Sequence, residues 1–296
     1  MKILLIYNPF AGHGHAQKIL PDVESIFEDN NVNFDLMTTD YHEHGITLVK
    51  EADFEKYDAV VAAGGDGTLF EVINGYFQNQ STRRIPIGVL PVGTGNAFAR
   101  DLDLDSNHWK EAIDIISLNK PRQVDVGKFL THGQTYYFLN ILGLGFVSDV
   151  TATAHKIKAI GNLAYTIGVF HQTLFLHTFG ARLEIDGQIL EHDCIFIEIS
   201  NTRYTANFLM APTAEIDDGR LDVTILKGLS RRKLLKCFPK IFTGEHVHME
   251  EVETYQAQKV KIITDTPKIL TPDGEVLGIT PIDVECLYRQ VEVLWK

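Results

Sequence analysis

Residues 58–68 read Asp-Ala-Val-Val-Ala-Ala-Gly-Gly-Asp-Gly-Thr. The apolar run at the start, with its two adjacent valines, is typical of a buried parallel strand. Glycines directly after a strand let backbone N–H groups come close to a phosphate, and a helix starting near Thr68 would add its positive dipole end. The stretch therefore predicts a strand, a phosphate-binding turn and a helix, which is the repeating unit of an α/β domain.

Asp66 is an unusual residue for a turn that binds only an anion. A carboxylate at this point can hold Mg²⁺, directly or through water, or accept a proton from an attacking hydroxyl group. The alternative is a plain tight turn in which aspartate serves as a turn former. The glycines on both sides and the threonine that follows favour the functional interpretation.

The first 120 residues alternate between strand-like and helix-like stretches. The expected strands are 2–7, 34–38, 58–63 and 86–90, and the expected helices are 15–30, 45–52, 68–77, 96–102 and 109–117. This alternation with short connections predicts a parallel sheet. Ligands of such sheets bind beyond the carboxyl ends of the strands. Three glycine-rich turns, at residues 8–12, 64–68 and 93–96, are expected at such ends.

The first and third of these turns carry polar side chains that suit a nucleotide. Asn8, before Pro9, offers amide donors, and Gly12 permits a close backbone approach. No Gly-Lys-Ser/Thr follows, so the turn is not a Walker loop. Thr94 and Asn96 can bond phosphate or ribose oxygens, and either can also cap the next helix.

Beyond about residue 122 the pattern changes to short strands, several of them separated by Asp-Gly turns. The expected strands are 124–129, 134–142, 181–185, 193–200, 221–226, 259–264, 268–271, 282–287 and 291–295, and the helical inserts are 149–177 and 230–242. Many short strands with glycine turns predict a β-sandwich. We therefore expect two domains, 1–123 and 124–296, with the last few residues able to pack back on the first.

Composition narrows the function. The net charge of −12 disfavours broad contact with nucleic acid, which depends on neutralising phosphates. The three cysteines, Cys194, Cys237 and Cys286, form no Cys-x-x-Cys pair, so reduced thiols in a cytoplasmic protein are expected. No segment approaches the roughly 20 apolar residues of a spanning helix. We expect contact with a membrane only at its surface, on the inner face.

The two helical inserts contain apolar residues that suit a lipid. Those of the first insert can line a lipid tail site or pack against the sandwich: Ile160, Leu163, Ile167, Phe170, Leu174 and Phe175. Lys156 and Lys158 can reach phosphate or lipid headgroups, or lie on a solvated face. The second insert begins with Ser-Arg-Arg-Lys and can lie on a membrane or be an ordinary surface helix. The pairs His42/His44 and His246/His248 are interpreted as surface residues.

Taken together, these motifs resemble the diacylglycerol kinase catalytic domain family, which includes bacterial lipid kinases, sphingosine kinases and ceramide kinases. The resemblance rests on Asn8-Pro9 with Gly12, Gly64 to Thr68, Pro91 to Asn96 with Ala99-Arg100, Gly143-x-Gly145-Phe146, Gly161-x-x-Ala164-Tyr165, Ile216 to Asp222, and Asp273-Gly274-Glu275. The motifs follow in order along nearly the whole chain. The Gly-Gly-Asp-Gly-Thr turn alone is less specific, because NAD kinases and phosphofructokinase-like folds use similar turns.

The resemblance implies a parallel, NAD kinase-like three-layer α/β domain, a C-terminal β-sandwich, and ATP in the cleft between them. It implies a Mg²⁺-dependent lipid kinase that transfers the γ-phosphate of ATP to a hydroxyl group of a lipid such as diacylglycerol. The positions that match the family's ATP site are Asn8, Pro9, Gly12, Thr39, Gly64, Gly65, Asp66, Gly67, Thr68, Thr94 and Asn96. Asp273 and Glu275 match the proposed proton acceptor, with Asp66 as a further candidate. Mg²⁺ is expected on the Asp218 side chain and the backbone carbonyls of Glu215 and Arg220.

Two departures from the family pattern concern the acceptor. Ala97 follows Asn96 where diacylglycerol-type members often have aspartate, and sphingosine kinases have alanine there. Thr151 stands where sphingosine kinases carry a second acid, so a sphingoid or ceramide-type acceptor also stays open. An NAD kinase-like enzyme is a further alternative, although the chain has no Asn-Glu pair. The last alternative is a regulator that binds a nucleotide without catalysis. Separately, exposed edges of the sandwich make a homodimer plausible.

Overall fold

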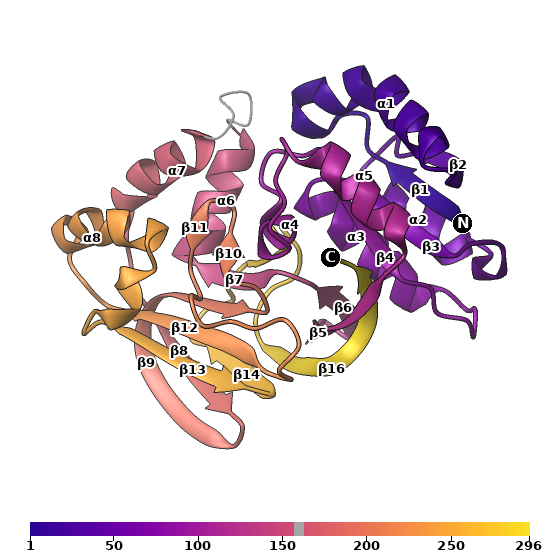
Figure 1. The fold of residues 1–296 in the computed structure, drawn as a ribbon. Helices are drawn as coiled ribbons and strands as arrows, with labels where there is room; N and C mark the ends of the chain where they lie inside the picture. Colours follow the sequence, from indigo (N-terminus) through magenta and orange to yellow (C-terminus); the bar gives the residue numbers. More distant parts are fainter. Residues whose placement is uncertain (157–162) are drawn as a thin grey trace. The chain divides into compact units, whose positions relative to one another are not determined.

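The computed structural model describes residues 1–156 and 163–296, which form two compact units (Figure 1). The first unit comprises Met1–Val124 and Arg289–Lys296, and the second comprises Asp125–Tyr288. The sequence expectations for Lys158, Ile160 and Gly161 lie outside the described residues. Those for the side chains of Lys156, Leu163, Ala164 and Tyr165 lie outside the described side chains.

The first unit is built on a parallel sheet with the strand order β16-β4-β3-β1-β2. Its strands are β1 (Lys2–Tyr7), β2 (Asn33–Thr38), β3 (Ala59–Gly64), β4 (Ile87–Pro91) and the end of β16 (Ile282–Leu294). All residues of β3 and β4 are buried, as expected for strands whose faces are both covered. The apolar runs thus identify the central strands of this unit.

Helices cover the sheet. The helices of this unit are α1 (Ala11–Asp29), α2 (His44–Glu51), α3 (Asp66–Gln78), α4 (Ala97–Asp101) and α5 (Trp109–Leu118), with a 3₁₀ turn η1 (Phe54–Lys56). Helices α1 and α5 pack together against β3 and β4, while α2 and α3 pack together against β1 and β3. The buried face of α1 repeats at helical spacing, with Ala16, Ile19, Val23 and Phe27. The expectation of a three-layer α/β domain is confirmed.

The strand order fixes where a ligand of this sheet would bind. Strand β1 is followed in the chain by β2 on one side of it, whereas β3 is followed by β4 on the other side. The direction of winding therefore reverses between the neighbouring strands β1 and β3, and ligands of open α/β sheets bind at the carboxyl ends of such strands. At this point the Asn8 N–H donates to the Ala63 carbonyl over 2.9 Å.

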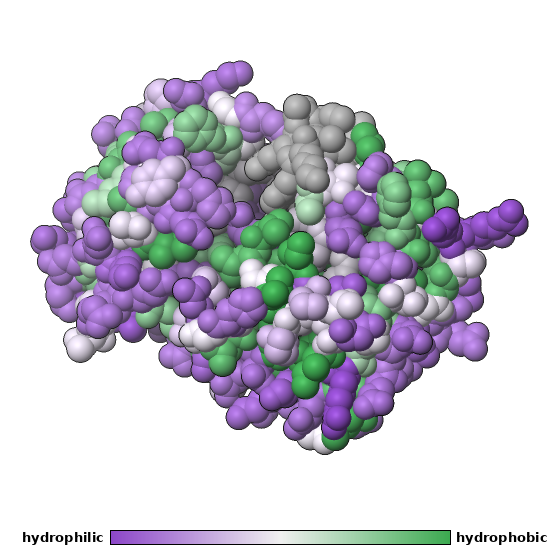
Figure 2. Space-filling model, turned by 180° about the vertical axis from the view of Figure 1, so that it is seen from behind, coloured by the Kyte–Doolittle hydropathy of each residue, from purple (hydrophilic) through white to green (hydrophobic). Residues whose placement is uncertain are grey.

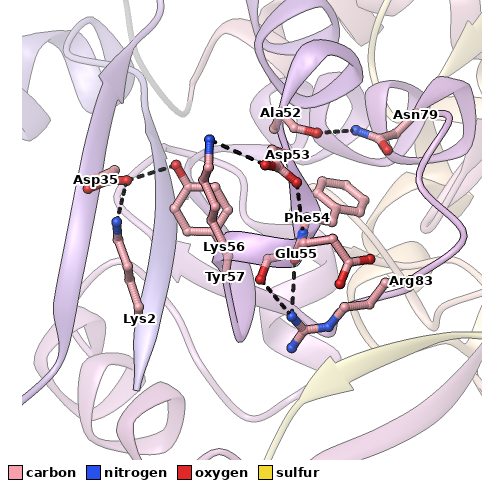
Figure 3. A network of polar contacts seen from close by, with 10 residues as sticks. All are labelled: Lys2, Asp35, Ala52, Asp53, Phe54, Glu55, Lys56, Tyr57, Asn79 and Arg83. Atoms are coloured by element: carbon pink, nitrogen blue, oxygen red, sulfur yellow. Dashed lines mark hydrogen bonds and ion pairs between the residues drawn. The ribbon is translucent and has the colours of Figure 1, made fainter.

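A polar network joins segments near the amino ends of the strands (Figure 3). The Asp35 carboxylate forms an ion pair of 2.8 Å with the Lys2 ammonium and accepts a hydrogen bond of 2.8 Å from the Tyr57 hydroxyl. The hydrogen bonds from Lys2 and Tyr57 lower the pKa of Asp35. After α3, the Asn79 amide donates to the Ala52 carbonyl over 2.8 Å. These polar groups are satisfied by other groups of the protein, which gives this edge of the sheet a structural role.

The second unit is antiparallel β-structure. Its strands are β5 (Pro121–Thr131), β6 (Gln134–Phe138), β7 (Ile141–Gly145), β8 (Phe179–Ile185), β9 (Gln188–Ser200), β10 (Tyr204–Thr205), β11 (Phe208–Leu209), β12 (Leu221–Lys227), β13 (Val252–Ala257), β14 (Lys259–Thr264), β15 (Leu270–Pro272) and the start of β16. The order is β13-β12-β9-β8-β14-β16; β7 pairs with β9 and β15, and β5 with β16 and β6. Apolar residues from nearly all of these strands form one core, as the expected β-sandwich requires.

Short helices interrupt these strands. They are α6 (Phe146–Lys156), α7 (Leu163–Thr173), α8 (Arg231–Cys237), and the 3₁₀ turns η3 (Phe238–Phe242) and η4 (Glu245–His248). The Ser230 hydroxyl caps α8 by accepting a hydrogen bond of 3.3 Å from the Lys233 N–H. Both helical inserts expected from the sequence are therefore present, each divided into two pieces.

The strands differ from the sequence expectation in four places, one of which is the unexpected short pair β10 and β11. The single strand expected over 134–142 is two strands, because the N–H groups at the break bond a distant carboxylate instead of a neighbouring strand. The strands expected at 282–287 and 291–295 are one continuous strand, β16. Strand β13 was not expected, because its four inner residues are Glu, Thr, Tyr and Gln and only its two ends are fully buried.

Candidate functional site

The three glycine-rich turns of the first unit meet at the carboxyl ends of its strands. The Asn8 amide donates to the Thr68 hydroxyl over 3.2 Å, which joins the first turn to the second. The Gly93 N–H donates to the Gly64 carbonyl over 2.9 Å, which joins the second turn to the third. The sequence expectation that these turns share one edge of the sheet is confirmed.

Glycine is required where these turns touch. Gly12 has φ 59°, in the left-handed region, and a Cβ atom there would lie 2.7 Å from the Val92 carbonyl oxygen. A Cβ atom on Gly93 would lie 2.4 Å from the Cα of Gly65, so no side chain fits between the two backbones. The glycines thus allow three loops to pack backbone against backbone.

Helix α3 begins at Asp66, directly at the junction of the turns. Gly65 is its N-cap and supplies no side-chain acceptor, so the first N–H groups of the helix are available to a ligand. Gly65, Asp66 and Gly67 are partly exposed. The Asp66 carboxylate lies 3.4 Å from the Phe98 N–H, which links it to the start of α4. The arrangement suits an anion next to a carboxylate.

The remaining predicted nucleotide residues lie at the same edge. Thr39 follows β2, and its N–H donates to the Tyr7 carbonyl over 2.9 Å. Thr94 is exposed, whereas Asn96 is buried and its amide donates to the Gly93 carbonyl over 2.8 Å. Asn96 occupies the N-cap position of α4 without a side-chain cap bond, so its capping role is not what the structure shows. Its Oδ1 finds no partner among the described residues and can accept a donor from a ligand.

Asp273 organises the second unit at the break between β6 and β7. Its buried carboxylate accepts hydrogen bonds of 3.0, 2.9 and 3.0 Å from the N–H groups of Leu139, Asn140 and Ile141. The residue itself has φ 46°. Glu275 is only partly buried on the same turn. The turn therefore presents one fixed carboxylate and one more accessible one.

The Asp218 turn gathers negative charge. The Asp218 carboxylate accepts a hydrogen bond of 2.9 Å from the backbone N–H of Arg220. The fully buried Asp125 carboxylate accepts one of 2.6 Å from the backbone N–H of Gly219. Burial, and then the charges of Asp125 and Asp218, raise the pKa of the Cys286 thiol to about 12.

The same acidic turn is where the sequence predicts Mg²⁺. Over residues 1–156 and 163–296, no three His, Cys, Asp or Glu side chains converge as a metal site. The expected set has only one such side chain, Asp218, besides the carbonyls of Glu215 and Arg220. These three groups all offer oxygen atoms, and carboxylates lie close by in the turn. Oxygen ligands and negative charge suit a hard cation such as Mg²⁺. The Mg²⁺ site therefore stays a prediction.

An apolar pocket lies within the second unit. It encloses about 810 Å³, including its opening to solvent. It is lined by Phe146, Val147, Val150, Thr151, Val169, Phe196, Glu198, Thr205, Phe208, Met210, Leu226, Leu229, Leu234, Cys237, Phe238, Ile241, His246, Met249 and Val252. Its size and apolar walls suit a hydrocarbon chain. Both helical inserts that the sequence marked as apolar contribute to its walls, but no local pattern indicated the pocket itself, because its walls come from elements up to more than 100 residues apart.

Comparison with known proteins agrees with this arrangement. Residues 2–129 match the family model described as the diacylglycerol kinase catalytic domain. Residues 140–295 match the one described as the YegS C-terminal NAD kinase beta sandwich-like domain. Diacylglycerol kinase of Bacillus subtilis is 30% identical over 295 residues, covering 98% of this chain and 95% of that protein. The chain belongs to the diacylglycerol kinase family.

Further relatives of this family show the same full-length match. Diacylglycerol kinase of Staphylococcus haemolyticus is 31% identical over 98% of this chain and 86% of its own length. A crystal structure of a diacylglycerol kinase from Bacillus anthracis covers 100% of this chain and 97% of its own, with 26% identity and a TM-score of 0.81. Both domains of the family are thus present in one chain.

The apolar residues expected at a lipid tail site do not line the pocket. The side chains of Ile167, Phe170, Leu174 and Phe175 are 41%, 54%, 64% and 61% exposed, whereas Val169 of the same helix is in the pocket wall. Within the part of the chain that the structure describes, no helix is long and apolar enough to cross a membrane.

His246 is not a surface residue, which corrects the interpretation of the second histidine pair. It is 3% exposed in the pocket wall, and its Nε2 lies 3.0 Å from the Met210 carbonyl oxygen. Burial lowers the pKa of its imidazole. His248, its partner in the sequence, is exposed as expected. Alternating histidines looked equivalent in the sequence, but η4 places only the first inside.

Glu198 is the most unusual side chain of the pocket. Its Oε1 accepts hydrogen bonds of 2.6 Å from the Thr205 hydroxyl and 3.3 Å from the Ser200 hydroxyl. Its Oε2 is buried and has no hydrogen-bond partner in the described part of the chain. Burial raises the pKa of the Glu198 carboxyl to about 7. No sequence motif marked this residue.

The Glu198 carboxyl should make stability depend on pH. Because its folded pKa is above the unfolded value, its contribution is present below about pH 4.5 and is lost as the pH rises to about 7. A Glu198→Gln variant cannot ionise at this position. The difference in unfolding free energy between the variant and the wild type should therefore shift by about 3 kcal/mol in favour of the variant as the pH rises from 5 to 8. Urea unfolding of both proteins at the two pH values measures this difference, and an unchanged difference would contradict the assignment.

Proposed function

We propose that this protein is a lipid kinase that transfers the γ-phosphate of ATP to a hydroxyl group of a lipid such as diacylglycerol, in a Mg²⁺-dependent reaction. The observation that carries the proposal is the convergence of three glycine-rich turns at the point where the winding of the sheet reverses. Its membership of the diacylglycerol kinase family supports the reaction class.

The nucleotide would bind at these turns. The N–H groups at the start of α3 and the glycine backbones would donate to phosphate oxygens. Asn8, Thr39, Thr68 and Thr94 would add side-chain contacts at the edge of the sheet. The unpaired Oδ1 of Asn96 would accept a hydrogen bond from a hydroxyl or amino group of the nucleotide.

Acidic residues would bind the metal and accept the proton of the lipid hydroxyl group. Phosphoryl transfer needs positioning, charge compensation and a group that takes the hydroxyl proton. We assign Asp66 to the metal or proton at the phosphates, and the Asp273–Glu275 turn to the proton acceptor. The three backbone donors of Asp273 hold its carboxylate in one orientation, while Glu275 is the more accessible acid.

Mg²⁺ on the second unit would be held by the Asp218 side chain and the carbonyls of Glu215 and Arg220. When bound there, the ion would supply positive charge that compensates the carboxylates of the turn. The Asp218 carboxylate already folds back onto the turn through the Arg220 N–H.

The lipid would place its hydrocarbon chain in the apolar pocket of the second unit. The walls are almost entirely Phe, Val, Leu, Ile and Met, so each buried CH₂ of a ligand gains about 0.8 kcal/mol by leaving water. The sequence left the lipid open at Thr151, and this residue lies in the pocket wall.

A surface that suits a membrane lies on the same unit. It comprises the exposed apolar residues Ile167, Phe170, Leu174, Phe175, Leu235 and Phe242, with the basic residues Arg231, Arg232, Lys233, Lys236 and Lys240. The rings of Phe170 and Phe238 lie 6.2 Å apart, which joins α7 to η3. Figure 2 shows apolar side chains reaching the surface beside strongly hydrophilic ones on the side that carries α7 and α8.

This surface supports a cytoplasmic protein that contacts the inner face of a membrane. Four of its cations, Arg231, Arg232, Lys236 and Lys240, form no ion pair within residues 1–156 and 163–296, whereas Lys233 pairs with Glu251. Basic side chains near an anionic leaflet gain about 1 kcal/mol each, although the whole chain carries −12. The exposed apolar side chains would add insertion at the interface.

Removing two of these charges should weaken membrane binding. An Arg231→Gln/Arg232→Gln variant should bind vesicles of mixed anionic and neutral lipid about 30-fold more weakly, because two contacts of about 1 kcal/mol are lost. Sedimentation with vesicles measures this, and activity on a short-chain soluble lipid should be unchanged. A Lys18→Gln/Lys50→Gln variant, on exposed residues of the first unit, is the control. Equal binding by all three proteins would contradict the assigned surface.

The reaction is tested by incubating the purified protein with ATP, with and without Mg²⁺, and with separate acceptors. These are dioctanoylglycerol, a short-chain ceramide, sphingosine and NAD. We expect ADP release that depends on Mg²⁺ and on a lipid, highest with dioctanoylglycerol. Release with NAD and with no lipid would overturn the proposal in favour of an NAD kinase-like enzyme. Binding of ATP without any acceptor-dependent release would favour a regulator.

A further inference from the structure

Glu198 brings to an apolar pocket an oxygen that has no hydrogen-bond partner among the residues that the structure describes. It lies on β9, where Phe196 and Glu198 line the pocket while Ile197 and Ile199 point into the sandwich core. Its neighbours across the strands are Thr224 on β12 and Gly143 on β7. The side chain is 0% exposed. A polar group buried this deeply without a partner costs free energy, unless a ligand completes it.

The two oxygens of Glu198 have different surroundings. Oε1 already accepts hydrogen bonds from the hydroxyls of Thr205 and Ser200, so it is the carbonyl-like oxygen of the group. Oε2 is therefore the oxygen that carries the proton when the carboxyl is neutral. Apolar surroundings favour the neutral form, as they do wherever a buried acid serves as a hydrogen-bond donor.

We propose that the protonated Oε2 of Glu198 donates a hydrogen bond to an ester carbonyl oxygen of the acceptor lipid, and that this contact selects acylated glycerols. The inference rests on the proposed lipid kinase function and names a specificity-determining residue for it. A lipid chain alone would gain only from the apolar walls, whereas an ester would also give a partner to Oε2 of Glu198, which has none among the described residues.

The position of Glu198 suits this role. In the sheet, Glu198 lies opposite Gly143, and Gly143 lies opposite Thr271 on β15. Adjacent strands are about 4.8 Å apart, so Glu198 is about 10 Å from the strand that leads into the Asp273–Glu275 turn. An ester held at Glu198 would thus have its hydrocarbon chain in the pocket, two strands away from Thr271, the polar residue of β15.

The contact should depend on pH. Among the described residues, the other titratable side chains of the pocket wall are His246 on η4 and Cys237 on α8, and Asp222 on β12 and Asp149 on α6 lie on elements that form the wall. Burial lowers the pKa of His246 and raises that of Asp222. Since Glu198 loses its proton near pH 7, wild-type affinity for an ester lipid should fall as the pH rises above 7. Glutamine always offers an N–H at this place, so a Glu198→Gln variant should lack that fall.

The test compares Glu198→Gln and Glu198→Met with the wild type on two lipids. One is dioctanoylglycerol, and the other is the matching dialkylglycerol ether, which has no carbonyl group. Glu198→Met should raise the KM for the ester about 10-fold, the value of one hydrogen bond, and leave the KM for the ether and for ATP unchanged. Glu198→Gln should match the wild type at pH 6.5 and exceed its ester affinity at pH 8.5. Glu191→Gln, an exposed residue of the same strand, is the control.

Three results would overturn the inference. If Glu198→Gln weakens ester binding as much as Glu198→Met, then Oε2 accepts a hydrogen bond instead of donating one. If Glu198→Met binds both lipids like the wild type, Glu198 does not contact the acceptor. If ester and ether lose affinity equally, the effect is packing alone.

Failure of the kinase proposal itself is recognised separately. Calorimetric binding of dioctanoylglycerol and its ether analogue to the same variants needs no turnover. If no lipid is phosphorylated but Glu198→Met selectively weakens binding of the ester, the carbonyl contact stands while the proposed reaction falls.

Discussion

An Asp66→Asn variant is expected to lose kcat by about 100- to 10,000-fold, the range that a positioned acid or base contributes. Asp66 begins α3 at the junction of the three turns, and its carboxylate is confined there. Its Oδ2 lies 2.8 Å from where a Cβ of Gly95 would be, and its Oδ1 lies 3.4 Å from the Phe98 N–H. Asparagine keeps the shape but removes the charge that would match a metal or a proton.

Binding of ATP should survive this change, because the expected phosphate contacts are backbone N–H groups of α3 and the glycine turns. The measurement is steady-state kinetics on dioctanoylglycerol together with calorimetric binding of ATP. Asp22→Asn, on the exposed side of α1, is the matched control and should keep full activity. Near-normal kcat in the Asp66 variant would refute the role assigned to this carboxylate.

A Gly93→Ala variant is expected to weaken ATP binding by about 10- to 100-fold. The new Cβ atom would lie 2.4 Å from the Cα and 2.7 Å from the nitrogen of Gly65, and backbone atoms cannot rotate away. The turns at 64–68 and 93–96 must then move apart, at a cost of about 1–3 kcal/mol. The unfolding free energy should fall by a similar amount, and calorimetry with ATP and urea unfolding measure the two effects.

The matched control is Gly180→Ala in β8. Its new Cβ atom would meet Asp265 at no less than 3.4 Å, which is ordinary contact, so ATP affinity should be unchanged and stability nearly so. If Gly93→Ala binds ATP as tightly as the wild type, close packing of the two turns is not needed for the nucleotide site.

Local signals in the sequence were sufficient for the first unit. Apolar runs identified β1, β3 and β4, and each glycine-rich turn directly follows a strand. In a parallel sheet the carboxyl ends of neighbouring strands share one edge, so chain order and sheet topology together predict that the turns meet. The contacts of Asn8 with Thr68 and of Gly93 with Gly64 agree with this reasoning.

The second unit depends on long-range contacts that local pattern does not contain. The strand break at Leu139 to Ile141 results from a carboxylate 134 residues away from Leu139 in the chain. Phe170 and Leu174 had the apolar character of a lipid site but are exposed. The pocket is lined by other residues, which come from α6, α7, α8, η3, η4 and strands of the sheet, and Glu198 stands out only after the chain has folded.

Thr151 lies at the part of the molecule that bears on the acceptor lipid. The sequence singled it out because sphingosine kinases carry an acid there, and the structure places it in the wall of the pocket with 5% exposure. The acid of this pocket is instead Glu198, on a different element. We therefore expect the choice of lipid to depend on the side chains of this pocket as well as on the turn at Asn96–Ala97.

The most direct test of lipid phosphorylation uses ATP labelled only in its γ-phosphate and, in parallel, ATP labelled only in its α-phosphate. Each is incubated with the protein, Mg²⁺ and dioctanoylglycerol in mixed micelles, and the lipid is extracted and counted. We predict label in the lipid extract from γ-labelled ATP alone, and its loss in the Asp66→Asn variant. No label in the lipid from γ-labelled ATP, while ATP binding is intact, would contradict the proposed function.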